Sequence, residues 1–276
     1  MKFELHCHTC YSKGTKLPWE GINSPEEIFR EAKRKGLHGV AVTDHNTIKA
    51  WKKSKEAEKK HGILFIPGIE INTKQGHLIG LGLNEFIPKG LNLDETIEKI
   101  HEQGGICVAP HPFDIKNEGI GMDFVKCDAA EVFNSLNLDR FSNVLAKRKV
   151  KKYGIPMVCG SDAHTKEMVG SCINFINAQT VDEVLKEIKK SNVRIATDYI
   201  SLNVIKKWAY QRLSFSYKDA VNYIEKNYNP VKKWVSKRLL DKFVSQPNRA
   251  VWTGLGYFGL FCSYIYSATR TVLKIL

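Results

Sequence analysis

The residue types that bind metal ions are concentrated in five short segments of this sequence, each directly after a short apolar run. These segments are His6-Cys7-His8, Thr43-Asp44-His45-Asn46, Gly68-Ile69-Glu70, His111-Pro112 and Gly160-Ser161-Asp162-Ala163-His164. They contain five of the 9 histidines, together with three carboxylates. Imidazoles and carboxylates that converge from several strand ends can hold metal ions in an enzyme. The segments together predict a metal-dependent enzyme.

The spacing within the first segment supports this prediction. His6 and His8 are two residues apart, so on a strand both side chains leave the same face. Cys7 lies between them and should point to the opposite face, although Cys7 and Cys10 flank His8 and are themselves possible ligand types. A single His-x-His pair is a weak signal, and the other four segments make it a strong one.

The composition is that of a globular protein, with 43% hydrophobic and 26% charged residues among 276. The 7 cysteines are an odd number and lie mostly in apolar runs, which predicts reduced core thiols and not a disulfide framework. The first motif begins too early for a signal peptide to precede it. We therefore expect a cytoplasmic protein.

The segments must be positioned by regular structure, and residues 1–200 alternate between strand and helix patterns. Ser24-Pro25-Glu26-Glu27, for example, predicts a helix start with a capping box, and Gly36 predicts its end. Alternating βα units indicate a mainly parallel sheet. A barrel explains polar clusters after most strands better than an open sheet does, because its strand ends converge on one rim.

Residues 201–276 have a different character. They contain 13 Lys or Arg and three Asp or Glu, a net charge of +10 within a chain total of +13. The pattern predicts basic amphipathic helices that carry Trp208, Tyr210, Tyr223 and Trp234. Residues 250–269 hold no charge, and a buried helix, a membrane-surface helix and a membrane span are alternatives for this segment. The basic extension is suited to nucleic acid or to an anionic membrane surface.

In the order and spacing of these motifs, residues 1–200 resemble the PHP (polymerase and histidinol phosphatase) family of metal-dependent phosphoesterases. The resemblance implies a distorted (β/α)7 TIM-like barrel and two or three divalent ions of Zn, Mn or Fe. It implies one ion held by His6, His8, Glu70 and Asp162. A second would be held by His111 and share Glu70, and a third would be held by His45 and His164. Asp44, next to the ligating His45, would instead orient an imidazole.

The sequence departs from the family pattern at three places. Lys13 stands where the family usually has Asp or His, and it is either a phosphate-holding cation or a solvated lysine. A usual His or Cys is missing near residues 131–135, where Glu131 is the replacement ligand that we expect. Phe113-Asp114 follow His-Pro, where many members have an Arg. His77 is either a residue that contacts substrate or protonates the leaving group, or a core histidine.

We expect a hydrolase that uses a metal-activated water on phosphate esters, with nucleotides or short oligonucleotides as substrates. One alternative is an exonuclease on single-stranded RNA or DNA, because the basic extension carries aromatic residues. Another is a non-catalytic, metal-stabilised module that binds a membrane or a partner through its basic extension. The sequence predicts a phosphatase or nuclease with His77, Lys13 and Asp44 in catalytic or supporting roles.

Overall fold

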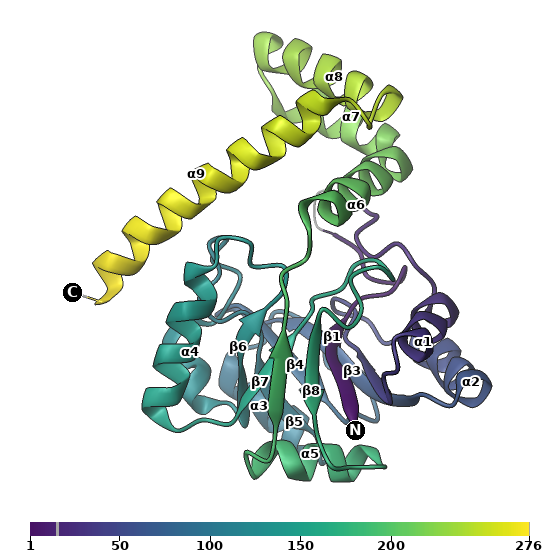
Figure 1. The fold of residues 1–276 in the computed structure, drawn as a ribbon, viewed down its shortest axis with the longest axis vertical. Coiled ribbons are helices and arrows are strands. Elements are labelled where there is room, and N and C mark those ends of the chain that lie inside the picture. Colours follow the sequence, from purple (N-terminus) through teal and green to yellow (C-terminus); the bar gives the residue numbers. More distant parts are fainter. Residues whose placement is uncertain (15–16, 276) are drawn as a thin grey trace.

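The computed structural model describes residues 1–14 and 17–275 and consists of a curved sheet surrounded by helices, followed by a helical C-terminal region (Figure 1). The nine strands are β1 (Lys2–Cys7), β2 (Gly39–Val42), β3 (Leu64–Asn72), β4 (His77–Leu81), β5 (Ile106–Ala109), β6 (Ala129–Asn134), β7 (Met157–Gly160), β8 (Cys172–Phe175) and β9 (Arg194–Thr197). Their order in the sheet is β7-β6-β5-β4-β3-β2-β1-β8-β9.

The first five helices surround this sheet: α1 (Pro25–Arg34), α2 (Trp51–His61), α3 (Leu93–Glu102), α4 (Phe141–Tyr153) and α5 (Val181–Lys189), with a 3-10 turn at Gly121–Lys126. The capping box at the start of α1 is confirmed, since Ser24 and Glu27 bond reciprocally. A similar box formed by Thr180 and Glu183 begins α5. The last strand, β9, is a short Arg-Ile-Ala-Thr run that is mostly exposed.

The sheet forms a nearly closed barrel, which confirms the predicted TIM-like fold. Backbone bonds join the two sides: His8 N–H donates to the Ala163 carbonyl at 2.8 Å, and Ala163 N–H donates to the His6 carbonyl at 3.3 Å. The buried Asn174 side chain bonds both the N–H and the C=O of Cys159. These contacts bring the segment after β7 against β1, so the first and last motifs become neighbours.

The sheet is more mixed than a regular barrel. Four pairings are parallel, and β3–β4, β4–β5, β1–β8 and β8–β9 are antiparallel. Because β4 runs opposite to β3, the first residue of β4, His77, pairs with Asn72 at the last residue of β3. The beginning of β4 therefore lies at the same rim as the ends of the parallel strands.

Inside the barrel, the apolar core lies at the end away from that rim. Ile79, Leu81, Ile106 and Val108 form a buried cluster with Val184, Leu185 and Ile188 of α5, which lies at the bottom of Figure 1. Cys7 packs into a different cluster with Ile28 and Phe29 of α1, as strand alternation predicted. With the apolar core at one end, the polar residues of the motifs are left to line the other.

The C-terminal region comprises α6 (Leu202–Phe215), α7 (Tyr217–Asn227), α8 (Pro230–Ser245) and α9 (Ala250–Ile275). In Figure 1, α6 leads away from the rim to α7 and α8, and the long α9 returns toward α4. Val204, Ile205 and Trp208 of α6 pack on the barrel cluster that includes Cys7. Because α6 packs on the barrel, the chain shows no clear separation at this point, and the domain boundary after residue 200 stays a prediction.

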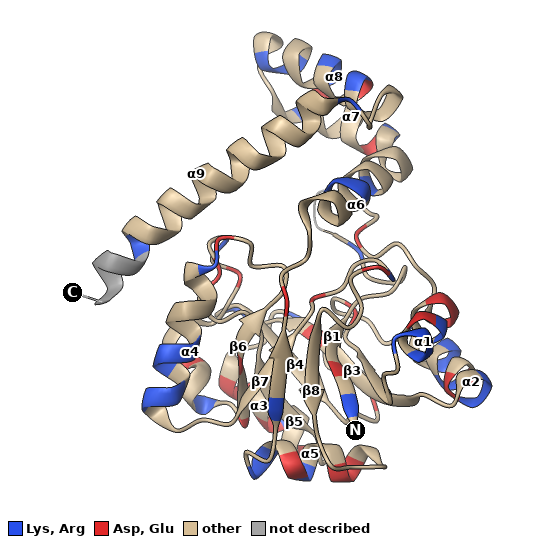
Figure 2. Cartoon of the chain, viewed as in Figure 1, with Lys and Arg blue, Asp and Glu red and all other residues tan. Residues whose placement is uncertain are grey.

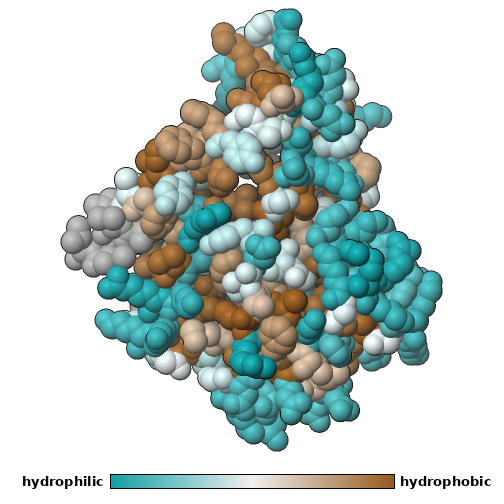
Figure 3. Space-filling model, viewed as in Figure 1, coloured by the Kyte–Doolittle hydropathy of each residue, from teal (hydrophilic) through white to brown (hydrophobic). Residues whose placement is uncertain are grey.

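Charge and hydropathy differ along this region. Figure 2 shows many Lys and Arg residues on α8 and almost none on α9 before its end, and Figure 3 shows hydrophobic side chains along α9. Tyr257, Phe258 and Phe261 of α9 are each at least 60% exposed. Within the described part of the chain, no helix combines the length and apolarity needed to cross a membrane.

Candidate metal centre

The side chains of all five motifs meet at the rim of the barrel. Glu70, near the end of β3, is 1% exposed and lies at their centre. Its Oε2 atom is 3.3 Å from His6 Nε2, 3.2 Å from His8 Nε2 and 3.2 Å from His45 Nδ1. Its Oε1 atom is 3.1 Å from His111 Nε2. One carboxylate therefore contacts four imidazoles from three of the other predicted segments.

The remaining predicted ligands close the other side of this cluster. Asp162 Oδ1 lies 3.5 Å from His6 Nε2 and 3.3 Å from His8 Nε2. The His8 and His164 rings stack with centroids 4.4 Å apart. Three overlapping groups have ligand atoms that all lie within 4.8 Å of one another: His6, His8 and Glu70; His8, His45 and His164; and His45, Glu70 and His77.

The histidine tautomers suit metal binding. His164 Nδ1 lies 2.8 Å from the Asp162 carbonyl, which can only accept, so Nδ1 carries the proton. His6 Nδ1 is 2.8 Å from Glu131 Oε1, and His8 Nδ1 is 3.1 Å from Ser12 Oγ. A ring that keeps its proton on Nδ1 can offer its Nε2 lone pair to a metal ion in the cluster, in place of a second proton. The buried Nε2 of His164 has no hydrogen-bond partner, so this donor set fits divalent metal ions.

The charges of the cluster are strongly coupled. Burial favours a protonated Glu70, but His45, His77 and His6 outweigh it and hold its pKa well below the ordinary value. Burial disfavours a charged His8, but Asp162 and Glu70 raise its pKa to about 9. Burial also disfavours the charged forms of His45 and His164, and here it outweighs the nearby carboxylates and lowers the pKa of each to about 3. The site combines ionised carboxylates with two imidazoles that stay neutral.

Glu131 has contacts different from those that a ligand needs. Its Oε1 accepts from His6 Nδ1, and its Oε2 accepts from the His111 backbone N–H at 2.9 Å and from Asn134 Nδ2 at 3.0 Å. Both oxygens are thus used on groups around the site. Gly160 faces this carboxylate, and a Cβ there would lie 1.9 Å from Glu131 Oε1 and 2.7 Å from His6 Cβ. Only glycine permits this approach.

Asp44, His77 and Lys13, which were predicted to have catalytic or supporting roles, lie at three different distances from the metal ligands. The Asp44 carboxylate accepts from Thr9 N–H at 2.6 Å and Thr9 Oγ1–H at 2.7 Å, so it holds the loop after β1 and not an imidazole. His77 Nδ1 is 3.0 Å from Glu70 Oε1, within the cluster itself. Lys13 lines the cavity above the cluster, with Nζ 4.1 Å from the centre of the Trp19 ring.

Several residues lie at the site although no sequence pattern placed them there. Ser12 also accepts from the His45 backbone N–H at 3.1 Å, so it links two motifs. Asn134 joins Glu131 to Asp162. Trp208 of α6 lies 4.8 Å from the His164 ring, and Arg212 lines the same cavity. Ser and Asn are common everywhere, and α6 is remote in sequence, so only the fold reveals these contacts.

Two of the predicted ligands have backbone conformations that non-glycine residues rarely adopt. The φ angle is 28° at His111 and 53° at Asp162. Such conformations cost about 1–3 kcal/mol each and persist where the surrounding structure enforces them. Here each one turns a predicted ligand into the cluster at the end of a short strand.

Comparison with known proteins agrees with this fold. The PHP-associated family model matches residues 140–193. An uncharacterized protein of Methanocaldococcus jannaschii is 45% identical over 55% of this chain and 92% of its own length, and a second one is 30% identical over 87% and 99%. A Bacteroides vulgatus protein that contains a predicted PHP-like metal-dependent phosphoesterase superposes with a TM-score of 0.57, at 16% identity over 76% of this chain and 69% of its own.

Two further relatives have names that describe an activity. A probable phosphatase of Caldicellulosiruptor saccharolyticus is 26% identical over 62% of this chain and 84% of its own. A 5'-3' exoribonuclease of Haemophilus influenzae is 31% identical over 38% of this chain and 37% of its own. Together with the fold, these matches support the resemblance of this chain to PHP-like metal-dependent phosphoesterases.

Proposed function

We propose that this protein hydrolyses phosphate esters at a centre of two or three divalent ions. The observation that carries this proposal is the convergence of the His6, His8 and His164 Nε2 atoms with the Glu70 and Asp162 carboxylates. The full set of proposed ligands is His6, His8, His45, Glu70, His77, His111, Asp162 and His164. Bound ions would lower the pKa of a water molecule and offset the negative charge of the phosphate.

The protein's own residues orient these ligands. Glu131 and Ser12 would keep the protons of His6 and His8 on Nδ1, as a carboxylate or hydroxyl behind a ligating histidine does. We therefore revise the expected role of Glu131 from ligand to positioning residue. Asp44 supports the loop that carries Ser12, and His77 is better placed as a ligand than as a proton donor.

Cations around the cavity favour an anionic substrate. Lys13, Lys116 and Arg212 line it, and Lys116 belongs to the loop after His111. Arg212 is partly engaged, because its Nε donates to the Trp19 carbonyl at 2.9 Å. The Lys116 side chain is mostly exposed and its Nζ is 3.4 Å from Glu118. We propose that Lys116 contacts the phosphate in place of the arginine that many family members have in this loop.

Two observations support a nuclease as the second candidate. One is the likeness of part of the chain to an exoribonuclease, and the other is the positive charge of residues 201–276. On α8, Arg238 lies 5.3 Å from the ring of the exposed Trp234, a pairing that is suited to stacking on nucleic acid. The sequence-based expectation of nucleotide or oligonucleotide substrates is retained as part of this alternative.

The test is metal analysis followed by hydrolysis assays with Mn²⁺ or Zn²⁺. The substrates are a phosphomonoester, a phosphodiester, a nucleoside 3',5'-bisphosphate, and single-stranded RNA and DNA. We expect two or three bound ions and hydrolysis of at least one ester, both lost when His6 and His8 are changed to Ala. The matched control is His38→Ala, at an exposed histidine outside the site. Bound metal without turnover of any substrate would favour the non-catalytic alternative.

A further inference from the structure

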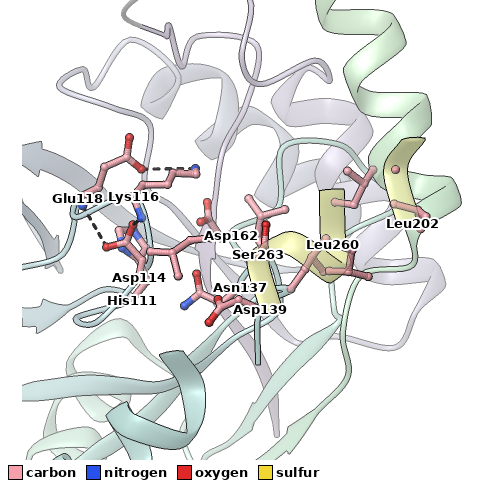
Figure 4. Close-up of a pocket in the computed structure, with 15 residues that line it drawn as sticks. His111, Asp114, Lys116, Glu118, Asn137, Asp139, Asp162, Leu202, Leu260 and Ser263 are labelled. Carbon is pink, nitrogen blue, oxygen red and sulfur yellow. Dashed lines mark hydrogen bonds and ion pairs between the residues drawn. The ribbon is translucent and has the colours of Figure 1, made fainter. Parts of the chain in front are cut away.

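A second cavity adjoins the metal centre. It has a volume of about 280 Å³, and the cavity above the metal ligands has a volume of about 320 Å³. The two share five lining residues: His111, Lys116, Glu118, Leu136 and Asp162. Figure 4 shows His111, Asp114, Lys116 and Glu118 on one side of the second cavity and Leu202 and Leu260 on the other. A substrate whose phosphate lies at the metal centre can extend into this space.

One wall of the second cavity is formed by α9. Its residues Gly256, Leu260 and Ser263 line the cavity, at the spacing of one helix face. Polar contacts attach the helix on both sides of that stretch. Thr253 Oγ1 accepts from Lys206 Nζ at 3.0 Å, and Arg270 donates to the Asp114 carbonyl at 2.6 Å and to Asn117 Oδ1 at 2.8 Å. The helix thus connects α6 to the loop that follows His111.

The lining of this cavity is mainly apolar. Six half-buried aliphatic side chains face it: Ile115, Leu136, Leu138, Leu202, Ile205 and Leu260. Its polar groups are largely bonded to other protein groups. Asp114 Oδ1 accepts from two backbone N–H groups, and Ser263 Oγ donates to the Gly259 carbonyl. Asp139 Oδ2 accepts from the Ser142 N–H at 2.9 Å. Binding of an apolar ligand group here is favourable, because it removes half-buried aliphatic surface from water.

We infer that this cavity binds an aliphatic group of the substrate, so that the preferred phosphate ester carries an alkyl chain. This inference rests on the proposed function. A nucleobase fits less well, because the described lining includes no Trp, Tyr or Phe ring for stacking and offers few unbonded polar groups. The polar cavity holds the phosphate and the apolar cavity holds the chain, which makes α9 a specificity element.

The test is calorimetric titration of the metal-loaded protein with methyl-, butyl- and octylphosphonate. These compounds keep the charged head group, and their P–C bond is not an ester, so binding is measured without turnover. We expect affinity to rise by about two- to four-fold per methylene until the cavity is filled. Equal affinities for methyl- and octylphosphonate would overturn the inference, as would tighter binding of a phosphonate analogue of adenosine monophosphate, which also lacks the ester bond, than of octylphosphonate.

A pair of leucines on opposite faces of α9 provides matched variants. Leu260 lines the cavity and Leu255 is 51% exposed to solvent. Leu260→Ser should lower the ratio of octyl- to methylphosphonate affinity about tenfold, and Leu255→Ser should leave this ratio unchanged. The ratio is taken within one protein sample, so it does not depend on how much of the variant folds. Equal reductions in both variants would contradict the inference.

The same experiment separates failure of the inference from failure of the proposed function. If octylphosphonate binds more tightly than methylphosphonate but no phosphate ester is hydrolysed, the cavity inference stands and the phosphoesterase proposal fails. If esters are hydrolysed but chain length changes neither binding nor kcat/KM, the phosphoesterase proposal stands and the cavity inference fails.

Discussion

The barrel rim and the C-terminal helices contribute to the site in different ways. At the rim, histidines and carboxylates are buried and held by other polar groups, as His6 is held by Glu131 and His8 by Ser12. The helices instead supply half-buried aliphatic and aromatic surface, such as Leu260 of α9 and Trp208 of α6. Chemistry needs fixed polar geometry, whereas selection among substrates needs a shaped surface. The two regions should therefore respond differently to substitution.

The largest effect should come from the centre of the rim. Glu70→Gln removes the charge that contacts five imidazoles, so the variant should lose at least one metal equivalent. Activity should fall by roughly a thousand-fold, since metal stabilisation of the reaction is worth several kcal/mol. Metal analysis and kcat/KM measure both effects. Glu95→Gln, on the exposed side of α3, is the control, and unchanged metal content in Glu70→Gln would remove Glu70 from the centre.

A single added methyl group should test how closely the rim is packed. Gly160→Ala places a Cβ within 1.9 Å of Glu131 Oε1, which forces Glu131 and His6 to move. We expect metal affinity to fall by about 10–100-fold, as when a residue that orients a ligand is lost. Gly259→Ala on α9 is the control, because a Cβ there would meet no atom within 4 Å. Wild-type metal affinity in Gly160→Ala would show that the rim tolerates this displacement.

Glu131→Gln should separate positioning from ligation. Gln can still accept a hydrogen bond from His6 Nδ1, but it carries no charge. Metal affinity should fall by about tenfold, with the full number of ions still bound at saturation. The measurement is metal stoichiometry at increasing metal concentration. Loss of one equivalent at saturation would restore Glu131 to the ligand set that the sequence predicted.

The C-terminal helices should differ among themselves. Trp208 packs on the barrel cluster, and its Nε1 donates to the Glu20 carbonyl at 2.8 Å, whereas Trp234 of α8 is 62% exposed. Trp208→Ala should lower the free energy of unfolding by about 2–3 kcal/mol. Trp234→Ala should change it by less than about 0.5 kcal/mol. Urea unfolding measures both, and equal losses would mean that α6 is no more integral to the barrel than α8.

The smallest effect should come from Asp128, next to β6 and outside the metal centre. Burial opposes its ionisation, but the Cys107 N–H and His101 outweigh this and lower its pKa. A carboxyl with a lowered folded-state pKa stabilises the protein above its unfolded pKa, and this contribution is lost as pH falls through the folded pKa. Asp128→Asn should lower stability by about 1 kcal/mol at neutral pH and by less in acid, with metal content unchanged.

The sequence alone determined the class of fold and most of the polar cluster. Strand alternation placed His6 and His8 on one face and Cys7 on the other, because side-chain direction along a strand is a local property. The capping residues of α1 were predicted for the same reason. The family resemblance then predicted the barrel and a set of ligands, most of whose side chains lie together at its rim.

Only the tertiary structure decided which groups support the ligands and what covers the site. The positioning contacts of Glu131, the approach of Gly160 and the place of His77 beside Glu70 depend on the register between strands, which no local pattern specifies. The uncharged residues 250–269 were consistent with several environments. The second cavity exists because α9 folds back on the loop after His111, and such a contact between distant segments has no signature in either one.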